Sequence, residues 1–584
     1  MPRRCEYWTF PELRKFSEDE QDSVLRKARG AKTDALEIVG MPLAVALTVV
    51  LTRYSAVGFA LPERIGAALG NLLIAIPLLL VFGTPLYVRR MRRALEAQFE
   101  ERQRWQVEAS TRVRAWIVCG ACLFLLATSA HAADASPILD GAQLSLAWVI
   151  PFVGMLLSIA ALPLVAPSLW HHHFGKISAF WALAFLVPFA TQWGPTVAVH
   201  EVAHTLVAEY LPFIILLLAL YTATGGIHIK GNLHGSPMLN TAILAVGTVF
   251  ASVMGTTGAS MLLIRPLLRA NDARKHKTHV VIFFIFLVSN IGGALTPLGD
   301  PPLFLGFLKG VDFFWTTKAM FWPTLTATGI LLVVFFALDM WFYHQPDEAR
   351  PDPTPDSRVR IEGKLNLLLL GPMILVTVFL SGVWKPGIHF EIVGVTIELQ
   401  NLLRDLTLVA IIWLSWRFTP RALRRAHHFE WGPMIEVAKL FAGIFLTIIP
   451  AIAILRAGSE GAMAPLLGLV TDEAGRPNNG MYFWATGALS SFLDNAPTYL
   501  VFFNLAGGDA GVLMGPMATT LASISAGAVF MGANTYIGNA PNFMVKSVAH
   551  ARGVKMPGFF GYMAWSGLIL LPVFALLTLL FFRH

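Results

Sequence analysis

The chain reads Ser289-Asn290-Ile291-Gly292-Gly293-Ala294-Leu295-Thr296-Pro297-Leu298-Gly299-Asp300-Pro301-Pro302 in the middle of an apolar segment that spans 280–308. Proline removes backbone donors and glycine weakens a helix, so several N–H and C=O groups of this stretch lose their helical partners. Hydrocarbon cannot satisfy those groups, and irregular backbone survives at membrane depth only where protein or a watery cavity surrounds it. The stretch therefore predicts a discontinuous helix, from which secondary transporters build ion and substrate sites.

The composition places the chain in a lipid bilayer. Of its 584 residues, 55% are hydrophobic and only 14% are charged, whereas a soluble domain carries roughly a quarter charged residues. Apolar runs long enough to cross a bilayer recur from residue 41 to the C-terminus, which predicts an all-α polytopic protein of the cell inner membrane. The net charge of +8 does not indicate nucleic-acid binding, because much of the positive charge lies in short clusters beside the apolar runs, where it fixes topology.

The first 133 residues divide into three parts. They are a charged cytoplasmic segment (1–40), two extra spans with a basic cytoplasmic segment (41–114), and a span or signal-like segment (115–133). The third part ends near Ala132 in the way a secretory signal does. The sequence leaves open whether this segment is cleaved and whether residues 1–110 belong to the mature protein.

Two transporter repeats are predicted after that point, at 134–344 and 363–584, joined by a cytoplasmic linker at 345–362 that is too rich in proline and charge to form a core. Each repeat contains a hairpin and then a broken helix, at 239–270 and 279–308 in the first and at 481–507 and 512–550 in the second. Placing the basic loop 89–114 in the cytoplasm puts the later basic clusters there as well, so the two hairpins enter from opposite sides. This pattern predicts an inverted repeat with two re-entrant hairpins and two discontinuous helices.

Small polar residues at the hairpin tips and breaks predict the ion or substrate site. Neutral hydroxyl and amide oxygens suit a hard cation such as sodium, whereas N–H groups at half-helix starts suit an anion. Asn290 and Asn534 take corresponding places at the two breaks, and 299–302 is echoed by 538–541. The predicted site residues are Thr256, Thr257, Ser289, Asn290, Asp300, Asp494, Asn495, Asn534 and Thr535.

Two carboxylates, Asp300 and Asp494, lie within these irregular elements. An ionisable residue at membrane depth is a functional hypothesis by default, because its burial is costly without a partner. A carboxylate that binds either a proton or a sodium ion gives antiport directly, since the two ligands compete for one site. The alternative is a capping role, for Asp300 at the half-helix that starts at Pro301 and for Asp494 at the hairpin bend.

His200-Glu201-Val202-Ala203-His204 matches His-Glu-x-x-His, in which two imidazoles one turn apart bind zinc and the glutamate is the base. The chemistry needs a third ligand, and the spacing turns Glu209 away from the histidine face. We therefore keep an intramembrane zinc protease only as a remote alternative and favour a loop or interfacial helix. The expectation is a protein that is not an enzyme and has no cofactor and no resident metal.

The residues 289–302 resemble the corresponding motif of the ion transporter superfamily, most closely its NhaD-type sodium:proton antiporter and citrate transporter branch. The resemblance covers roughly 140–584. It implies a scaffold domain and a mobile transport domain, often within a homodimer. The divalent-anion branch has Ser-Asn-Thr at both hairpin tips, whereas this chain has Gly-Thr-Thr-Gly at 255–258 and Leu-Asp-Asn-Ala at 493–496.

The leading hypothesis is therefore a secondary transporter that exchanges sodium for protons, with Asp300 and Asp494 as carriers. A proton- or sodium-coupled symporter of citrate or another carboxylate is the alternative. In either case the expected partners are the lipid bilayer, a small ion or carboxylate substrate and a second copy of the chain.

Overall fold

The computed structural model describes residues 139–583, with short gaps at 232, 347, 349–359, 381–383, 393–394, 421–422, 425–428 and 430. The sequence predictions for 1–40, 41–114 and 115–133 therefore lie outside the described residues. The chain divides into two compact units, and residues 139–388 and 399–583 belong to one of them. The described part of the other unit is a hairpin of strands β3 (His389–Ile392) and β4 (Val395–Glu398), paired antiparallel.

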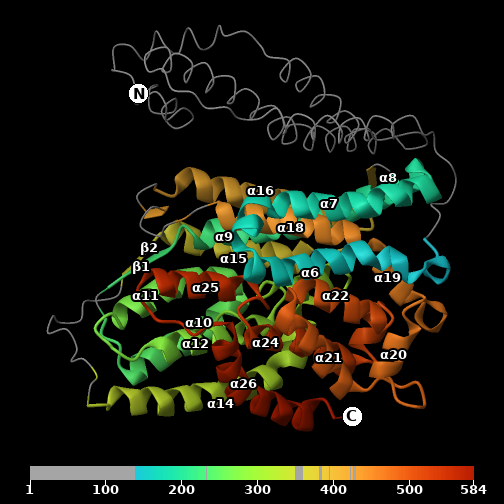
Figure 1. Ribbon diagram of the computed structural model, residues 1–584. Coiled ribbons are helices and arrows are strands. Elements are labelled where there is room, and N and C mark those ends of the chain that lie inside the picture. The colour runs from blue at the N-terminus through green and yellow to red at the C-terminus, as the bar shows by residue number, and fades with distance from the viewer. Residues whose placement is uncertain are drawn as a thin grey trace, which may run out of the picture. The chain divides into compact units, whose positions relative to one another are not determined.

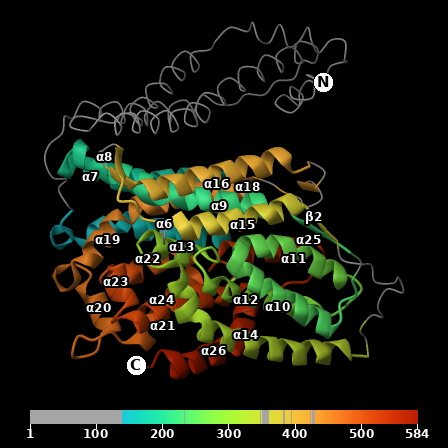
Figure 2. The ribbon, with the colours of Figure 1, turned by 180° about the vertical axis from the view of Figure 1, so that it is seen from behind.

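The larger unit contains two groups of helices (Figure 1, Figure 2). A π-helical turn at Thr205–Tyr210 joins α8 to α9. The first group comprises α6 (Ile150–Val165), α7 (Pro167–Trp193), α8 (Pro195–His204), α9 (Leu211–Thr224), α15 (Lys364–Val378), α16 (Leu399–Phe418), α18 (Gly432–Thr447) and α19 (Ile449–Arg456). The second group comprises α10 (Pro237–Met254), α11 (Thr256–Ala270), α12 (Thr278–Leu287), α13 (Pro301–Leu308), α14 (Phe313–Tyr343), α20 (Ala464–Val470), α21 (Asn479–Phe492), α22 (Asn495–Leu505), α23 (Ala510–Met514), α24 (Ala518–Met531), α25 (Ala540–Ala551) and α26 (Phe559–Phe581).

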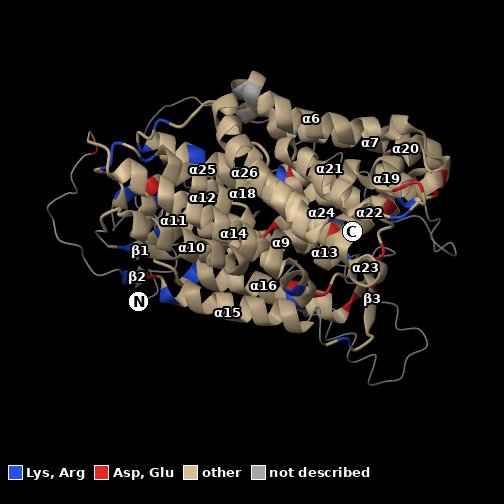
Figure 3. Cartoon of the chain, turned by 90° about the horizontal axis from the view of Figure 1, so that it is seen from below, with Lys and Arg blue, Asp and Glu red and all other residues tan. Residues whose placement is uncertain are grey.

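The lengths and apolar composition of the helices confirm an all-α polytopic membrane protein. Among the described residues, seven spans are long and apolar enough to cross a membrane, and the pair α18–α19, bent by 43°, is an eighth candidate. Charged residues gather near the ends of the helices, by β1 (His228–Lys230) and β2 (Arg360–Glu362) and by α19 and α20, with few between (Figure 3). Strands β1 and β2 pair antiparallel. Because β2 covers the last three residues of the predicted linker (345–362), that linker ends in a short strand.

Local sequence signals set the helix ends. Ser236, Asp312 and Asn478 each accept a backbone N–H from the first turn of α10, α14 and α21, which satisfies donors that have no helical partner. The turn from α10 into α11 occurs at Gly255, whose φ of 80° is a conformation that favours glycine.

The same order of elements occurs twice in the second group. A hairpin (α10–α11, α21–α22) is followed by a helix that breaks (α12–α13, α24–α25) and then by a long helix (α14, α26). A 3-10 turn fills each break, at Ile291–Leu295 and at Gly532–Asn534. The breaks and hairpins lie where glycine and proline predict them, while the side from which each hairpin enters a membrane stays a prediction.

Helix α12 lies at the centre of the second group, and its residues from Val280 to Leu287 are at most 1% exposed. A helix that is apolar on every face is expected to be buried on every face. This burial explains why the sequence of α12 shows no amphipathic pattern.

A buried ionic network, which sequence reasoning did not predict, joins α10, α12 and α14. Asp339 is 0% exposed, and one of its oxygens, Oδ1, lies 2.7 Å from Arg274 Nη2 and 2.7 Å from His279 Nε2. Its other oxygen accepts a hydrogen bond from Asn240 Nδ2 at 2.9 Å. The network links Asn240 of α10 and Arg274, just after α11, to Asp339 of α14. Separating these elements would leave a buried charge without a partner, which costs several kcal/mol.

Candidate functional site

Asp300 directly precedes α13 but does not cap it. The first two residues of α13 are Pro301 and Pro302, which have no N–H to offer, so a carboxylate at this position finds no nearby backbone donor. The side chain instead turns toward other elements and is 1% exposed. The capping alternative for Asp300 is therefore wrong.

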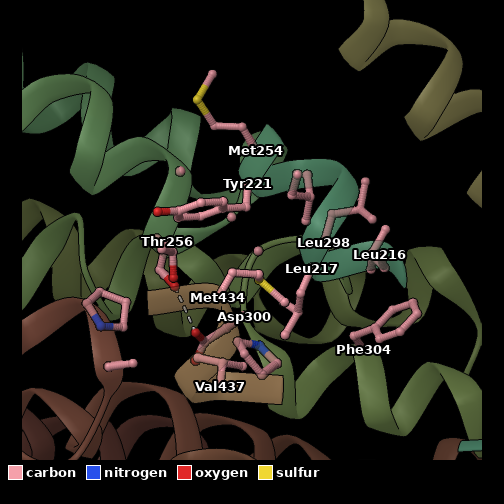
Figure 4. A pocket seen from close by; sticks show the side chains of 18 of the residues that line it. Leu216, Leu217, Tyr221, Met254, Thr256, Leu298, Asp300, Phe304, Met434 and Val437 are labelled. Carbon is pink, nitrogen blue, oxygen red and sulfur yellow. Dashed lines mark hydrogen bonds between the residues drawn. The ribbon is translucent and has the colours of Figure 1, made fainter. Parts of the chain in front are cut away.

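Three neutral side chains donate hydrogen bonds to the Asp300 carboxylate. Thr256 Oγ1 lies 3.0 Å from Oδ1 (Figure 4), and Asn539 Nδ2 lies 3.4 Å from the same oxygen. Asn495 Nδ2 lies 2.5 Å from Oδ2. These donors come from the first hairpin, the second break and the second hairpin, so all four irregular segments meet at one carboxylate.

Close backbone contact holds the first hairpin tip against the first break. The N–H of Thr256 donates to the carbonyl of Gly299 at 2.8 Å. A Cβ added at Gly299 would lie 2.1 Å from the carbonyl oxygen of Gly293, so only glycine fits there. The glycines of the break thus bring the Asp300 backbone and the hairpin tip together.

Ser289 and Asn290, both predicted site residues, lie beside this carboxylate without bonding to it. Ser289 Oγ is 2.8 Å from Ser260 Oγ. Asn290 Nδ2 donates to Asn542 Oδ1 at 2.7 Å, which links the first break directly to α25. Asn290 Oδ1 accepts from Asn539 Nδ2 at 3.4 Å.

Asn534 and Thr535 fasten the second hairpin to the second break. Asn534 Nδ2 donates to Ser491 Oγ at 2.9 Å, and the Thr535 hydroxyl donates to the Ser491 carbonyl. Neither residue bonds to Asp300. Their position indicates a supporting role rather than direct contact with the carboxylate.

Asp494 caps α22, as the structural alternative predicted, because its Oδ1 accepts the N–H of Ala496 at 3.1 Å. The residue is only partly buried, and it immediately precedes Asn495, which contacts Asp300. Asp494 and Asp300 are therefore close neighbours without a hydrogen bond between them. The assignment of Asp494 as a second carrier stays a prediction.

The equivalent residues of the two breaks differ from those that the sequence predicted. Asn290 and Asn534 are not equivalent by contact, whereas Thr296 donates to the Ser252 carbonyl just as Thr535 does to that of Ser491. Both members of the second contact lie 239 residues beyond their counterparts, and the same offset relates Thr256 to Asn495 and Asp300 to Asn539. Asn539 and Asn542 were missed, although the echo between 299–302 and 538–541 already aligned Asp300 with Asn539.

A pocket opens beside Asp300, between α9 and α18 of the first group and the tip, break and α25 of the second (Figure 4). Its lining is mostly apolar and includes Leu217, Met254, Phe304 and Met434. Thr257 lines it next to Thr256. Asp300 is the only carboxylate in this lining, and none of the described residues that form it is Lys, Arg or His. The pocket therefore supplies no permanent positive charge.

His200, Glu201 and His204 line a separate pocket, which Asp140 also lines. His200 Nδ1 is 4.0 Å from its neighbour Glu201, and Glu209, the conceivable third ligand, pairs with Lys309 instead. Within the part of the chain that the structure describes, no group of three or more His, Cys, Asp or Glu side chains is placed to hold a metal ion. The motif thus has no assembled zinc ligand set here.

Repeated apolar spans and a buried carboxylate between two helix breaks define the class of multi-pass membrane transporters. Residues 141–582 match the profile of a family described as "Putative citrate transport", and the chain belongs to this family. Two similar curated proteins are uncharacterized transporters of Mycobacterium bovis and Mycobacterium tuberculosis. Each is 24% identical over 335 residues, which cover 55% of this chain and 72% of the relative.

Proposed function

We propose that this transporter exchanges sodium for protons and that Asp300 binds the two ions alternately. The observation that carries the proposal is a carboxylate only 1% exposed, held by neutral donors and without a cationic partner in its pocket. Such a carboxylate needs either a proton or a cation to offset the cost of its burial. Because the two ligands occupy one group, binding of one displaces the other.

Neutral oxygens around Asp300 suit sodium as the second ligand. Thr256 supplies a hydroxyl, and Asn495 supplies an amide whose Oδ1 is buried without a hydrogen-bond partner. A buried acceptor with no donor is free to bind a cation. Asn539 adds a second amide beside the same carboxylate.

The two hairpin–break pairs support an inverted repeat, with hairpins that enter the membrane from opposite sides. The pocket lies between the two helix groups, at the tips of the second. We propose that the second group moves against the first and so exposes Asp300 alternately to the two sides of the cell inner membrane. We also propose that two copies of the chain form a homodimer through their first groups of helices.

Symport of citrate or another carboxylate is the second candidate, and the family description favours it. Two features weigh against a free carboxylate as the substrate. The pocket has no Lys, Arg or His in its described lining, and α13 begins with two prolines that offer no N–H to an anion. A carboxylate would have to bring its own cations into this pocket.

Purified protein in liposomes separates the candidates when sodium and pH gradients are applied in turn. An inward sodium gradient should drive protons outward, which a trapped pH dye reports, and labelled citrate should not accumulate. Citrate uptake driven by either gradient, without sodium–proton exchange, would establish the symporter instead.

A further inference from the structure

Each helix break places one side chain at the same structural position. Asp300 and Asn539 precede α13 and α25, with φ −144° and ψ 143° for Asp300 and φ −155° and ψ 142° for Asn539. Neither side chain bonds to its own helix. Instead they face each other, with Asn539 Nδ2 3.4 Å from Asp300 Oδ1.

The hairpin tips repeat this equivalence. Thr256 and Asn495 are the first residues of α11 and α22, and they donate to different oxygens of Asp300. The four side chains are between 0% and 4% exposed. Of these two pairs of equivalent positions, 256 with 495 and 300 with 539, only position 300 carries an ionisable group.

We infer, on the basis of the proposed exchange, that Asn539 determines stoichiometry by limiting this site to one negative charge. One proton or one sodium ion then neutralises the site, and the loaded site has the same charge in both directions of transport. The exchange is therefore electroneutral. A carboxylate at position 539 would face Asp300 at hydrogen-bond range, where one sodium ion would bridge both groups while full protonation takes two protons. Two protons would then exchange for one sodium ion, and the loaded site would differ by one charge between the two directions of transport.

Three other charged or titratable groups lie on or beside elements that contact this site. The carboxylate of Asp494 is engaged at the start of α22, where it accepts the N–H of Ala496. Lys546 of α25 lies over the ring of Tyr536, 4.0 Å from its centroid. Tyr221 of α9 lines the pocket. The hydrogen bonds that hold the Asp300 carboxylate come from the neutral side chains of Thr256, Asn495 and Asn539, so Asp300 is left as the exchangeable charge.

The test measures whether transport responds to membrane potential. Liposomes with wild-type protein and a sodium gradient are clamped at 0 or −100 mV with potassium and a potassium ionophore, and a trapped dye reports proton flux. Wild-type flux should be the same at both potentials. Asn539→Asp should make it potential-dependent, because each extra elementary charge shifts the sustainable sodium gradient by about 50-fold per 100 mV.

Two further variants protect the test against misfolding of Asn539→Asp. The double variant Asp300→Asn with Asn539→Asp moves the single carboxylate to the other break. Its sodium-driven proton flux should again be the same at both membrane potentials. Proton flux in Asp494→Asn should also be the same at both membrane potentials. Potential-dependent exchange in the wild type or in Asp494→Asn would overturn the inference. So would potential-independent exchange in Asn539→Asp, or a folded but inactive double variant. Complete absence of sodium–proton exchange in the wild type would contradict the proposed function instead.

Discussion

The break before α13 and the break before α25 are built alike and end differently. In each, a threonine hydroxyl donates to the carbonyl of a hairpin serine, Thr296 to Ser252 and Thr535 to Ser491. In each, a glycine precedes the last residue of the break and leaves no room for a Cβ. Serine, threonine and glycine contacts thus set the shape of both breaks, while the residue after the glycine sets their chemistry.

That last residue is an aspartate in one break and an asparagine in the other. Two breaks with the same backbone conformation therefore carry one negative charge between them, and not two. Removing the charge of Asp300 should therefore affect transport most. Removing one of the glycine or threonine contacts that the breaks share should lower the stability of the protein by the same amount in either break.

The largest effect is expected from Asp300→Asn. The amide keeps the shape of the side chain but binds neither a proton nor a cation as a carboxylate does, so sodium-driven proton flux should fall to the rate of empty liposomes. The matched control is Asp312→Asn, which makes the same change at the exposed cap of α14, where asparagine caps equally well. Wild-type flux in Asp300→Asn would remove this residue from the mechanism.

The glycines test whether both breaks need the same close approach. A Cβ at Gly299 would lie 2.1 Å from the Gly293 oxygen, and one at Gly538 would lie 2.5 Å from that of Gly532. Alanine at either position should destabilise the protein by about 3 kcal/mol, because the backbone must shift. Thermal unfolding in detergent measures this loss.

Gly329→Ala in α14 is the control for these variants, because a Cβ there meets nothing within 4 Å. It should stabilise the protein slightly, since alanine is the better helix former. Destabilisation by only one of the two break variants would show that the breaks are not held alike.

A smaller loss is expected when the threonine contacts are removed. Thr296→Val and Thr535→Val each deprive a carbonyl near the end of a hairpin helix of its donor, at Ser252 and Ser491. Each should cost about 1–2 kcal/mol in thermal unfolding. Thr578→Val is the control, because its hydroxyl bonds within its own helix α26. Unequal losses for the two break threonines, beyond the change in the control, would contradict a shared frame.

Sequence reasoning located the irregular elements because glycine and proline disrupt helices wherever they cluster. The break at 289–302 and the turn at Gly255 both follow from that rule. It could not assign partners, since Asp339 and Asn240 lie 99 residues apart and Asn539 lies 239 residues beyond Asp300. It also could not say that Asp300 turns away from α13, while Asp494 caps α22, because that choice depends on which backbone donors and distant side chains are within reach.

The smallest effect is expected from Asp494→Asn, which separates the cap of the second hairpin from the carboxylate of the first break. Asparagine retains an oxygen for the N–H of Ala496, so α22 keeps its cap. Loss of the charge weakens the start of α22 by about 0.3–1 kcal/mol. Because Asn495 of α22 contacts Asp300, we expect flux to fall, and by at most about the fivefold that this energy allows. The same proteoliposome assay measures it beside Asp300→Asn. A fall to the background rate would instead make Asp494 a second carrier, and the two halves of the molecule would then each contribute one titrating carboxylate from a different kind of element.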